Sequence, residues 1–580
     1  MDDRGDALAL RLPATGEVLM TGADGELVLS DVGPAPVRFM AATGCADYPE
    51  VELNVSGPHL SGPTPNGEVQ GFVDTHLHVT AHEFLGGRVH CGRPWHPYGA
   101  PTALVDCPDH SLTGGAGAVL ENLLSGGLPV EPHDTVGWPT FADWPAPGSL
   151  THEQTYYRWL ERAWHGGLRI MVNLLVENRV LCEIYPLKLN PCDEMASVRL
   201  QAQRIRELER YIDAQSGGPG EGWFRIVDDP DEARAVANQG KLAVVLGIEV
   251  SEPFGCSSYL GVPQCSAEQI DADLDELQRL GVRQLTVIHK FDNALGGVAG
   301  DGGTKGTVIN VGNFYGTGRF WDFETCDAED TGVHDNDQEL VPGAAEHTAL
   351  FGAILSAFGP ELALPLYPPP HHCNVLGLSP LGRHAIEAMA ERGMIVDVDH
   401  MSVRARQEAL DVLEELQHPG VISSHSWSTP DAYSRIYALG GMTGPYAGGS
   451  EGFVDAWRQR RAAADPRYLF GIGFGADSNG LGAQGMPRGA DAENPVTYPF
   501  TGFGGVVIDK QVSGSRVYDI NVDGVAHYGL YPDWIEDLRR LAGDEIVADL
   551  ARGAEAYLQT WERSLAAAEQ AGSPPAAPPA

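Results

Sequence analysis

The chain has 580 residues and a formal charge of −41, because 79 Asp and Glu outnumber 38 Lys and Arg. A strongly acidic surface repels polyanions, so nucleic acid is excluded as an expected partner. The sequence contains no uninterrupted apolar run long enough for a membrane helix, so no membrane partner is predicted. The length suits one large domain with long loops as well as it suits several small domains.

The first informative segment is residues 71–78, Gly-Phe-Val-Asp-Thr-His-Leu-His, a short apolar run that ends in two histidines. Alternate residues of a strand point to the same side, so His76 and His78 can place both imidazoles in one site. Neutral imidazole is a common ligand for zinc and related metals. The pair alone is weak evidence, because short His-x-His patterns arise by chance.

Seven further segments are predicted to be strands, and five of them end in a histidine or a carboxylate. Near-continuous apolar runs of this kind are typical of strands buried on both faces, as in parallel sheets. The segments are 168–176, 242–249, 284–289, 394–400, 420–425, 438–446 and 468–477. Their polar ends are Glu249, His289, His400, His425 and Asp477.

Helical patterns alternate with these strands. Apolar residues recur at three- and four-residue spacing in 194–214, 266–280, 379–392 and 402–416. Eight strands interleaved with helices predict an α/β fold of the (β/α)8 TIM-barrel class. Catalytic groups of such barrels gather at the C-terminal ends of the strands, where these histidines and carboxylates stand. A single histidine that closes a strand is usually structural, but the joint occurrence predicts a metal site.

Three regions fall outside the repeating pattern of the barrel, which we assign to residues 69–560. Residues 1–68 alternate short apolar runs with turns and predict a small β-rich N-terminal segment. Two long loop insertions are expected at 84–166 and 294–345. The aromatic residues of the first favour an ordered wall over the site, whereas the second is equally consistent with a substrate-shaping loop and a solvated decoration. Residues 569–580 are expected to form a disordered tail.

A glycine-rich stretch inside the second insertion, GGVAGDGGTKG at 296–306, is vaguely similar to a phosphate-binding loop. It lacks the Gly-Lys-Ser/Thr ending, and no helix is predicted after it. We interpret it as a flexible loop.

Four segments resemble a known family. They are LTVIHKFDNALGG at 285–297, GLSPLGRHAIEAMAERGMIVDVDHMS at 377–402, VISSHS at 421–426 and GIGFGADSNG at 471–480. The pattern looks like the amidohydrolase superfamily and, within it, the membrane (renal) dipeptidase family. With the first and third strands included, the resemblance spans residues 70–560.

The resemblance implies a centre of two divalent metal ions. His76 and His78 would hold one ion, and Glu249 would bridge both with its two carboxylate oxygens. His400 and His425 would hold the second ion.

It also implies roles in the reaction. His289 would contact the substrate carbonyl or the developing oxyanion. Asp477 would belong to the metal site, beside the bound water, and act as base and then as acid. Arg435 lies near where the family places an arginine for a substrate carboxylate, although a solvated surface arginine fits this position equally well. Asp74, Asp397 and Asp399 are candidates to orient the imidazoles, and buried carboxylates bonded to backbone are the equal alternative.

One departure from the family concerns the first strand. The dipeptidase family has His-x-Asp there, whereas this chain has His76-x-His78, the form that other branches of the superfamily use. The metal pair would face one carboxylate fewer, which puts simple dipeptidase activity in doubt. No lysine ends a predicted strand, so a carbamylated lysine bridge is not expected.

The implied activity is hydrolysis of an amide or peptide C–N bond in a small-molecule or peptide-like substrate. Two divalent ions about 3.5–4 Å apart can share a bridging hydroxide, because a metal lowers the pKa of bound water to about 7. Zinc is the expected metal, and manganese, cobalt or iron would suit the ligands as well. The same site could serve a lactonase or a phosphoesterase. The third alternative is a non-catalytic binding protein, which a missing ligand would have favoured.

The nine cysteines leave the cellular location open. Cys91 with Cys107, Cys182 with Cys192 and Cys256 with Cys265 are close pairs that could be disulfides in an exported enzyme. Cys45, Cys326 and Cys373 would be left over. Reduced thiols are the equal alternative, because no signal peptide is visible in the first 30 residues, and this makes a cytoplasmic location the default.

Overall fold

The structure is a computed structural model that describes residues 2–3, 8–12, 15–38, 48–58, 60–105, 121, 133–326, 331–338, 365 and 367–572. Eight parallel strands form its centre, and their order around the sheet follows their order in the chain. Tyr446, just after β17, pairs in parallel with Gly475 of β18, which closes the circle. The predicted (β/α)8 TIM barrel is confirmed. Its strands are β6 (Phe72–Leu77), β7 (Leu168–Glu177), β9 (Leu242–Val250), β12 (Val282–Thr286), β15 (Ile395–Asp397), β16 (Val421–Ser423), β17 (Met442–Thr443) and β18 (Phe474–Gly475).

The barrel strands are buried on both faces, as their continuous apolar sequences require. The longest pairing joins β7 to β9, in register from Ile170 opposite Ala243 to Glu177 opposite Val250. This register carries Glu249 to the C-terminal end of the sheet. A short extra strand that the sequence did not indicate, β8 (Phe224–Ile226), pairs with the beginning of β9.

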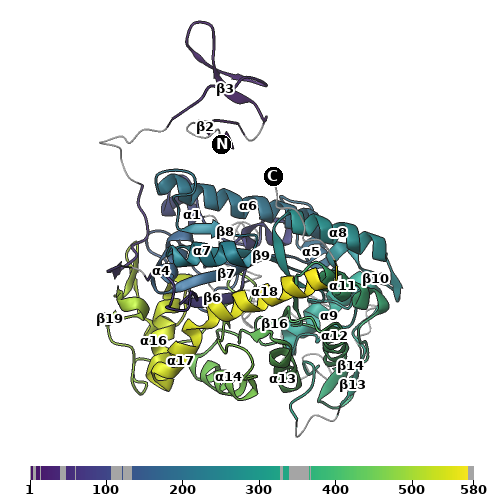
Figure 1. Cartoon of the computed structure of the whole chain (residues 1–580). Coiled ribbons are helices and arrows are strands. Elements are labelled where there is room, and N and C mark those ends of the chain that lie inside the picture. The colour runs from purple at the N-terminus through teal and green to yellow at the C-terminus, as the bar shows by residue number, and fades with distance from the viewer. Residues whose placement is uncertain are drawn as a thin grey trace.

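Helices surround the barrel (Figure 1), and all the helices that the sequence predicted are present. Ser266, Ser379 and Ser402 accept the backbone N–H three residues ahead and so cap three of them. The outer helices are α6 (Glu194–Gln215), α7 (Pro230–Asn238), α8 (Ala267–Arg279), α11 (Pro380–Glu391), α12 (Val403–Leu416), α13 (Pro430–Leu439), α14 (Ser450–Ala463), α16 (Tyr531–Ala542) and α17 (Asp544–Ala551).

The C-terminal helix α18 (Gly553–Gln570) runs across the barrel in Figure 1. Tyr557 and Trp561 of this helix are fully buried in one cluster with Val73, Val245 and Ile395 of three barrel strands. Helix α18 therefore seals the interior of the barrel, and the polar site lies at the opposite, C-terminal ends of the strands.

Small sheets and short helices lie outside the barrel, and the N-terminal strands β2 and β3 stand apart from it in Figure 1. None of the described helices is long and apolar enough to cross a membrane. The remaining short elements are β1 (Asp2–Asp3), β2 (Leu8–Ala9), β3 (Val18–Thr21), β4 (Leu27–Ser30), β5 (Val55–Ser56), β10 (Ser258–Tyr259), β11 (Val262–Pro263), β19 (Phe500–Thr501), β20 (Val507–Ile508), β21 (Gln511–Ser513), β22 (Arg516–Tyr518), α15 (Ile520–Asp523), η2 (Pro253–Gly255), η3 (Phe503–Gly505) and η4 (Tyr528–Leu530).

The two insertions contain more regular structure than their sequences indicated. The interpretation of 296–306 as a flexible loop is wrong, because a helix of 15 residues, α9, begins inside it at Gly303. Glycine composition hid this helix, since its stability comes from packing and not from propensity. Residues 106–120, 122–132, 327–330, 339–345 and 573–580 of the predicted insertions and tail lie outside the described residues. The elements that lie in or overlap the two insertions are η1 (Ala81–Gly86), α1 (Ala100–Ala103), α4 (Tyr157–His165), α9 (Gly303–Thr317) and β13 (Phe323–Thr325). Helix α5 (Arg179–Ile184) follows β7, and β14 (His372–Asn374) follows the second insertion.

Disulfides join Cys182 to Cys192 and Cys256 to Cys265. Of the two alternatives for these pairs, disulfides and reduced thiols, the structure contains the disulfides. Cys91 is also disulfide-bonded, and its predicted partner Cys107 lies outside the described residues. The expectation that Cys326 and Cys373 are left over is wrong, because they form a disulfide. The antiparallel pairing of β13 with β14 brings them together across 47 residues, a proximity that sequence spacing could not reveal.

Candidate metal centre

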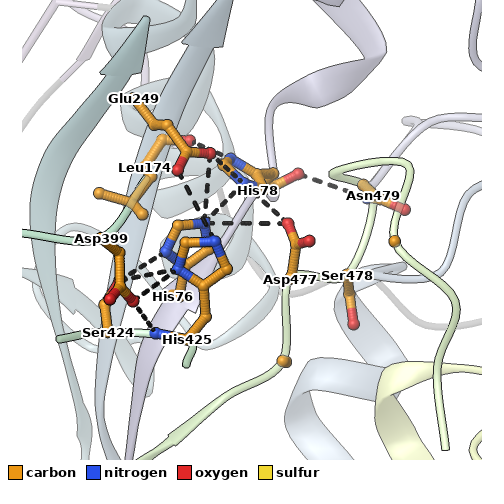
Figure 2. Close-up of polar contacts among 12 residues, drawn as sticks. His76, His78, Leu174, Glu249, Asp399, Ser424, His425, Asp477, Ser478 and Asn479 are labelled. Atoms are coloured by element: carbon orange, nitrogen blue, oxygen red, sulfur yellow. Dashed lines mark hydrogen bonds and ion pairs between the residues drawn. The ribbon is translucent and has the colours of Figure 1, made fainter. Parts of the chain in front are cut away.

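Two imidazoles from the first strand face one oxygen of Glu249. His76 lies on β6 and His78 follows it, so both side chains point to the same side of the strand (Figure 2). Their Nε2 atoms lie 3.1 Å apart, and they lie 3.3 and 3.4 Å from Glu249 Oε2. All three side chains are buried.

Two further imidazoles face the other oxygen of Glu249. The Nε2 atoms of His400 and His425 lie 2.9 Å apart. They lie 3.2 and 4.0 Å from Glu249 Oε1. The structure therefore brings together all five residues that the resemblance assigned as metal ligands, with a pair of histidines on each side of one carboxylate.

The outer ring nitrogens fix the tautomer of two of these histidines, His78 and His425. His78 Nδ1 lies 2.8 Å from the carbonyl oxygen of Leu174, which can only accept, so this nitrogen carries the proton. His425 Nδ1 faces Asp399 Oδ2 at 3.2 Å, and His76 Nδ1 faces Ser424 Oγ at 2.8 Å. In all three rings Nδ1 makes the outer contact and Nε2 is directed into the centre, which is the orientation that metal-binding histidines require.

This arrangement fits divalent metal ions. Lone pairs on His76 Nε2 and His78 Nε2 that face each other at 3.1 Å repel unless a proton or a metal cation lies between them. Glu249 Oε1 is buried and has no hydrogen-bond partner. Burial by itself would lower the pKa of His78, but hydrogen bonds to Asp477 and Glu249 and their charges raise it to about 10. The site thus favours positive charge at this position, and imidazole with carboxylate is a suitable donor set for zinc, manganese, cobalt or iron.

Two further imidazoles of the centre, those of His76 and His289, are poised to be neutral, and the carboxylates of Glu249 and Asp477 are poised to be charged. Burial lowers the pKa of His76 to about 4 and that of His289 to about 3. Burial alone would raise the pKa of Glu249, but the surrounding histidines, His289 first, hold it well below its usual range. Burial would also raise the pKa of Asp477, but the hydrogen bond to His78 and the charges of nearby histidines lower it to about 2. Metal ions bind these protonation states.

His289 and Asp477 border the four histidines that face Glu249. His289 Nε2 lies 3.5 Å from Glu249 Oε2, so His289 reaches the centre as closely as those four histidines do. Asp477 Oδ1 lies 3.2 Å from His78 Nε2 and 3.8 Å from His76 Nε2. Asp477 and His400 both have a positive φ, 49° and 63°, which costs a non-glycine residue about 1 kcal/mol or more. This backbone conformation directs the side chains of His400 and Asp477 into the site.

Asp399, Asp74 and Asp397 were candidates either to orient an imidazole or to bond to the backbone as buried carboxylates, and the structure contains both kinds. Asp399 orients an imidazole, because it contacts His425, the histidine that ends the next strand along the chain. Asp74 accepts the backbone N–H groups of His76 and Ala476. Asp397 accepts the backbone N–H of Asp399. Asp74 and Asp397 therefore fix the backbone of the strand ends, not the rings.

The assignment of Arg435 to the substrate is wrong. This arginine lies on the outer face of α13, where its guanidinium pairs with Asp411 and Glu414 of α12 at 2.6 Å each. The loop after His425 is short, and α13 begins at Pro430, so residue 435 is carried away from the strand end. Arg435 is therefore a surface arginine, which was the second interpretation that the sequence allowed.

The first insertion packs against the loop after β18. Asn479 Nδ2 donates to Glu153 Oε1 at 3.0 Å, and the backbone N–H of Gln154 donates to Asn479 Oδ1 at 3.0 Å. His90 also contacts the carbonyl of Asn479. Residues from this insertion thus form part of the wall beside Asp477.

Other site residues had no signal in the sequence. Ser424 and the carbonyl of Leu174 orient His76 and His78, and neither residue type marks a metal site by itself. The ring of Trp427 packs on that of His400, with centroids 4.0 Å apart. Strand alternation could have indicated Ser424, but Trp427 follows a turn.

A separate group consists of His334 and Asp337 of the second insertion and His371, which directly precedes β14. Its two imidazoles are stacked, with centroids 4.1 Å apart and planes at 23°. These three residues are half-buried, whereas the histidines around Glu249 are buried.

Comparisons with known proteins give weak likenesses. No family model matches the chain, and no curated protein matches it. Among solved structures, an amidohydrolase from Pseudomonas aeruginosa is 13% identical, with a TM-score of 0.36, over 69% of this chain and 90% of that one. The dipeptidase AC, a metallopeptidase of family M19, is 14% identical, with a TM-score of 0.39, over 70% and 88%. A Rhodobacter sphaeroides metallopeptidase liganded with a phosphinate mimic of the dipeptide L-Ala-D-Ala is 12% identical, with a TM-score of 0.39, over 70% and 89%. At these values neither fold nor activity follows from the likeness.

Proposed function

We propose that this protein is a metal-dependent hydrolase that cleaves an amide or peptide C–N bond. The observation that carries the proposal is the division of the centre by Glu249, with His76 and His78 at Oε2 and His400 and His425 at Oε1. One carboxylate with a histidine pair on each oxygen suits two divalent ions, and zinc is the first candidate.

Bound divalent ions would supply a Lewis acid and lower the pKa of a water molecule at the centre. Asp477 has a carboxylate that is charged at neutral pH and lies beside the histidines of β6. It can accept a proton from attacking water and return it to the leaving nitrogen. His289 is neutral at this pH and can hydrogen-bond the oxygen of the scissile carbonyl as it gains negative charge. Amide hydrolysis needs these two functions beside the metal chemistry.

The first test is a metal analysis of protein purified without chelators. Two equivalents of zinc or a similar ion per chain are expected, and removal by a chelator should abolish hydrolysis until the metal is restored. Dipeptides, N-acyl amino acids, lactones and phosphotriesters should then be assayed with the same holoprotein. Protein without bound metal would overturn the proposal, and turnover confined to lactones or phosphotriesters would overturn the amide assignment.

A further inference from the structure

The group of His334, Asp337 and His371 lies apart from the ligands around Glu249 and has the donor set of a metal site. Each of the three residues offers one ligand atom, and these atoms all lie within 4.8 Å of one another. His371 Nδ1 and Asp337 Oδ2 lie 2.9 Å apart. Ligand atoms of one zinc ion are about 3–4 Å apart, so small rotations of these half-buried side chains would bring all three donors to one ion.

Two of the three donors are oriented by the backbone. His334 Nδ1 lies 2.6 Å from the carbonyl oxygen of Asp335, which can only accept, so in the neutral ring the lone pair lies on Nε2. Asp337 Oδ1 accepts the backbone N–H of His372 at 3.0 Å, while Oδ2 faces His371. Backbone contacts to the second polar atom of a side chain are typical of metal ligands, because they fix the direction of the first.

Contacts within the protein already hold together the two segments that supply these donors. Asp335 Oδ2 accepts the backbone N–H of Asn374 at 2.8 Å, and the backbone N–H of Gln338 donates to His372 Nδ1 at 2.8 Å. The disulfide between β13 and β14 restrains the same strand. An ion would therefore bind donors that are largely in place, which reduces the entropy lost on binding.

The charge of Asp337 distinguishes this group from an ordinary surface pair. Within the described part of the chain, its ion-pair contacts are both to imidazoles, and no lysine or arginine is among them. His384 and Asp271 form a similarly half-buried pair at 3.2 Å, but there Arg392 also lies 3.9 Å from the carboxylate. A carboxylate whose neighbours are neutral imidazoles attracts a cation more strongly than one that already faces a guanidinium.

A cavity gives an ion access to the group. His334 lines a cavity of about 320 Å³, together with Gly332, Asn336 and Thr429. A site with three protein ligands needs a further position for water, and it needs a path by which the ion enters. The cavity beside His334 meets both needs.

We propose that His334, Asp337 and His371 bind one zinc ion that ties the second insertion to the chain before β14. The proposal does not rest on the hydrolase function, because none of the three residues belongs to the centre around Glu249. The ion joins segments 34 residues apart and would stabilise the folded chain, since the unfolded chain does not hold the three donors together. A half-buried site with three ligands holds its ion less tightly than a buried site with more, so dialysis should empty it first.

The binding test titrates zinc chloride by calorimetry into full-length protein that has been dialysed against metal-free buffer. The wild type should bind one zinc ion more than His371→Ala and His334→Ala do, or bind it at least tenfold more tightly, since even loss of an orienting residue weakens metal sites about 10- to 100-fold. His384→Ala is the matched control, because it removes an imidazole that pairs with an aspartate at similar exposure. The comparison counts the site by difference, so it holds whatever the centre around Glu249 retains. Equal zinc binding by the wild type and both site variants would overturn the proposal.

Thermal unfolding tests the structural role of the ion. Zinc added to the dialysed wild type should raise its melting temperature, because a ligand that binds only the folded chain stabilises it by mass action. The rise should be smaller in His371→Ala than in the wild type and His384→Ala. An equal rise in all three proteins would overturn the structural role, and this outcome is independent of whether any amide is hydrolysed.

Discussion

Asp399 holds His425 at two points with one oxygen. Its Oδ2 accepts the backbone N–H of His425 at 2.7 Å and lies 3.2 Å from the ring Nδ1. Burial alone would raise the pKa of Asp399, but the hydrogen bonds and charge of His425 lower it below its usual range. The carboxylate therefore fixes both the position and the tautomer of a proposed metal ligand.

The Asp399→Asn substitution should weaken metal binding by about 10- to 100-fold, because loss of an orienting partner has this effect on metal sites. Competition with a chromogenic chelator measures the change. Asp411→Asn, at a carboxylate that pairs with Arg435 on the surface, is the control. Unchanged metal affinity in Asp399→Asn would contradict the orienting role.

The Asp477→Asn substitution should lower kcat by about 10²- to 10⁴-fold, the range that a positioned general base contributes. The amide retains the size of the side chain but cannot accept a proton at neutral pH. Metal content, measured on the same samples, should remain at the wild-type level. A metal-replete Asn variant with full activity would remove Asp477 from proton transfer.

The Gly480→Ala substitution should misplace Asp477, because the new Cβ would lie 1.9 Å from its Oδ1 and 2.8 Å from His78 Cδ2. We expect kcat to fall at least tenfold, since small displacements of catalytic groups are costly, while the melting temperature changes little. Gly452→Ala in α14 meets no atom within 4 Å and serves as the control. Equal activity in the two variants would show that the loop tolerates the added methyl group.

Glu177, at the end of β7, gives a pH dependence of stability that is separate from the metal ligands. Its buried carboxyl accepts the N–H groups of Leu85 and Asn178, yet burial raises its pKa to about 7. Between its ordinary pKa of 4.5 and 7, the folded state holds a proton that the unfolded chain releases. Stability from this group is thus complete below pH 4.5 and is lost as the pH rises through 7.

The Glu177→Gln substitution should remove that loss. Its melting temperature at pH 8 should exceed that of the wild type by about 1–3 °C, and the difference should shrink towards pH 5. Scanning calorimetry in one metal-containing buffer series measures it. A difference that is constant with pH would exclude titration of Glu177 as the cause.

The Cys326–Cys373 disulfide should contribute about 2–4 kcal/mol to the free energy of unfolding. Replacing both residues by serine lowers stability because the unfolded chain regains the freedom of a 47-residue loop. The Cys182–Cys192 pair, with a separation of 10, should give the smaller loss in urea unfolding. A peptide map of non-reduced protein should contain the Cys326–Cys373 link, and free thiols at both positions would refute it.

The sequence by itself determined the barrel and the five proposed ligands. Buried parallel strands need continuous apolar runs, and each run that ends in a histidine or carboxylate places that group at the same end of the barrel. Local pattern alone therefore indicated the strand-end groups, and the family resemblance selected five of them, His76, His78, Glu249, His400 and His425, as the proposed ligands. Helix caps such as Ser379 could also be predicted from the sequence, because a cap contacts a backbone N–H only three residues ahead.

Only the tertiary structure decided which groups support and surround this centre. Asp399 contacts a histidine one strand further along, Arg435 turns to the surface, and Cys326 meets Cys373 across a strand pairing. Helix α9 begins within a glycine-rich stretch that has no helical pattern. These contacts join residues distant in the chain through packing and charge, which leave no fixed spacing in a single sequence.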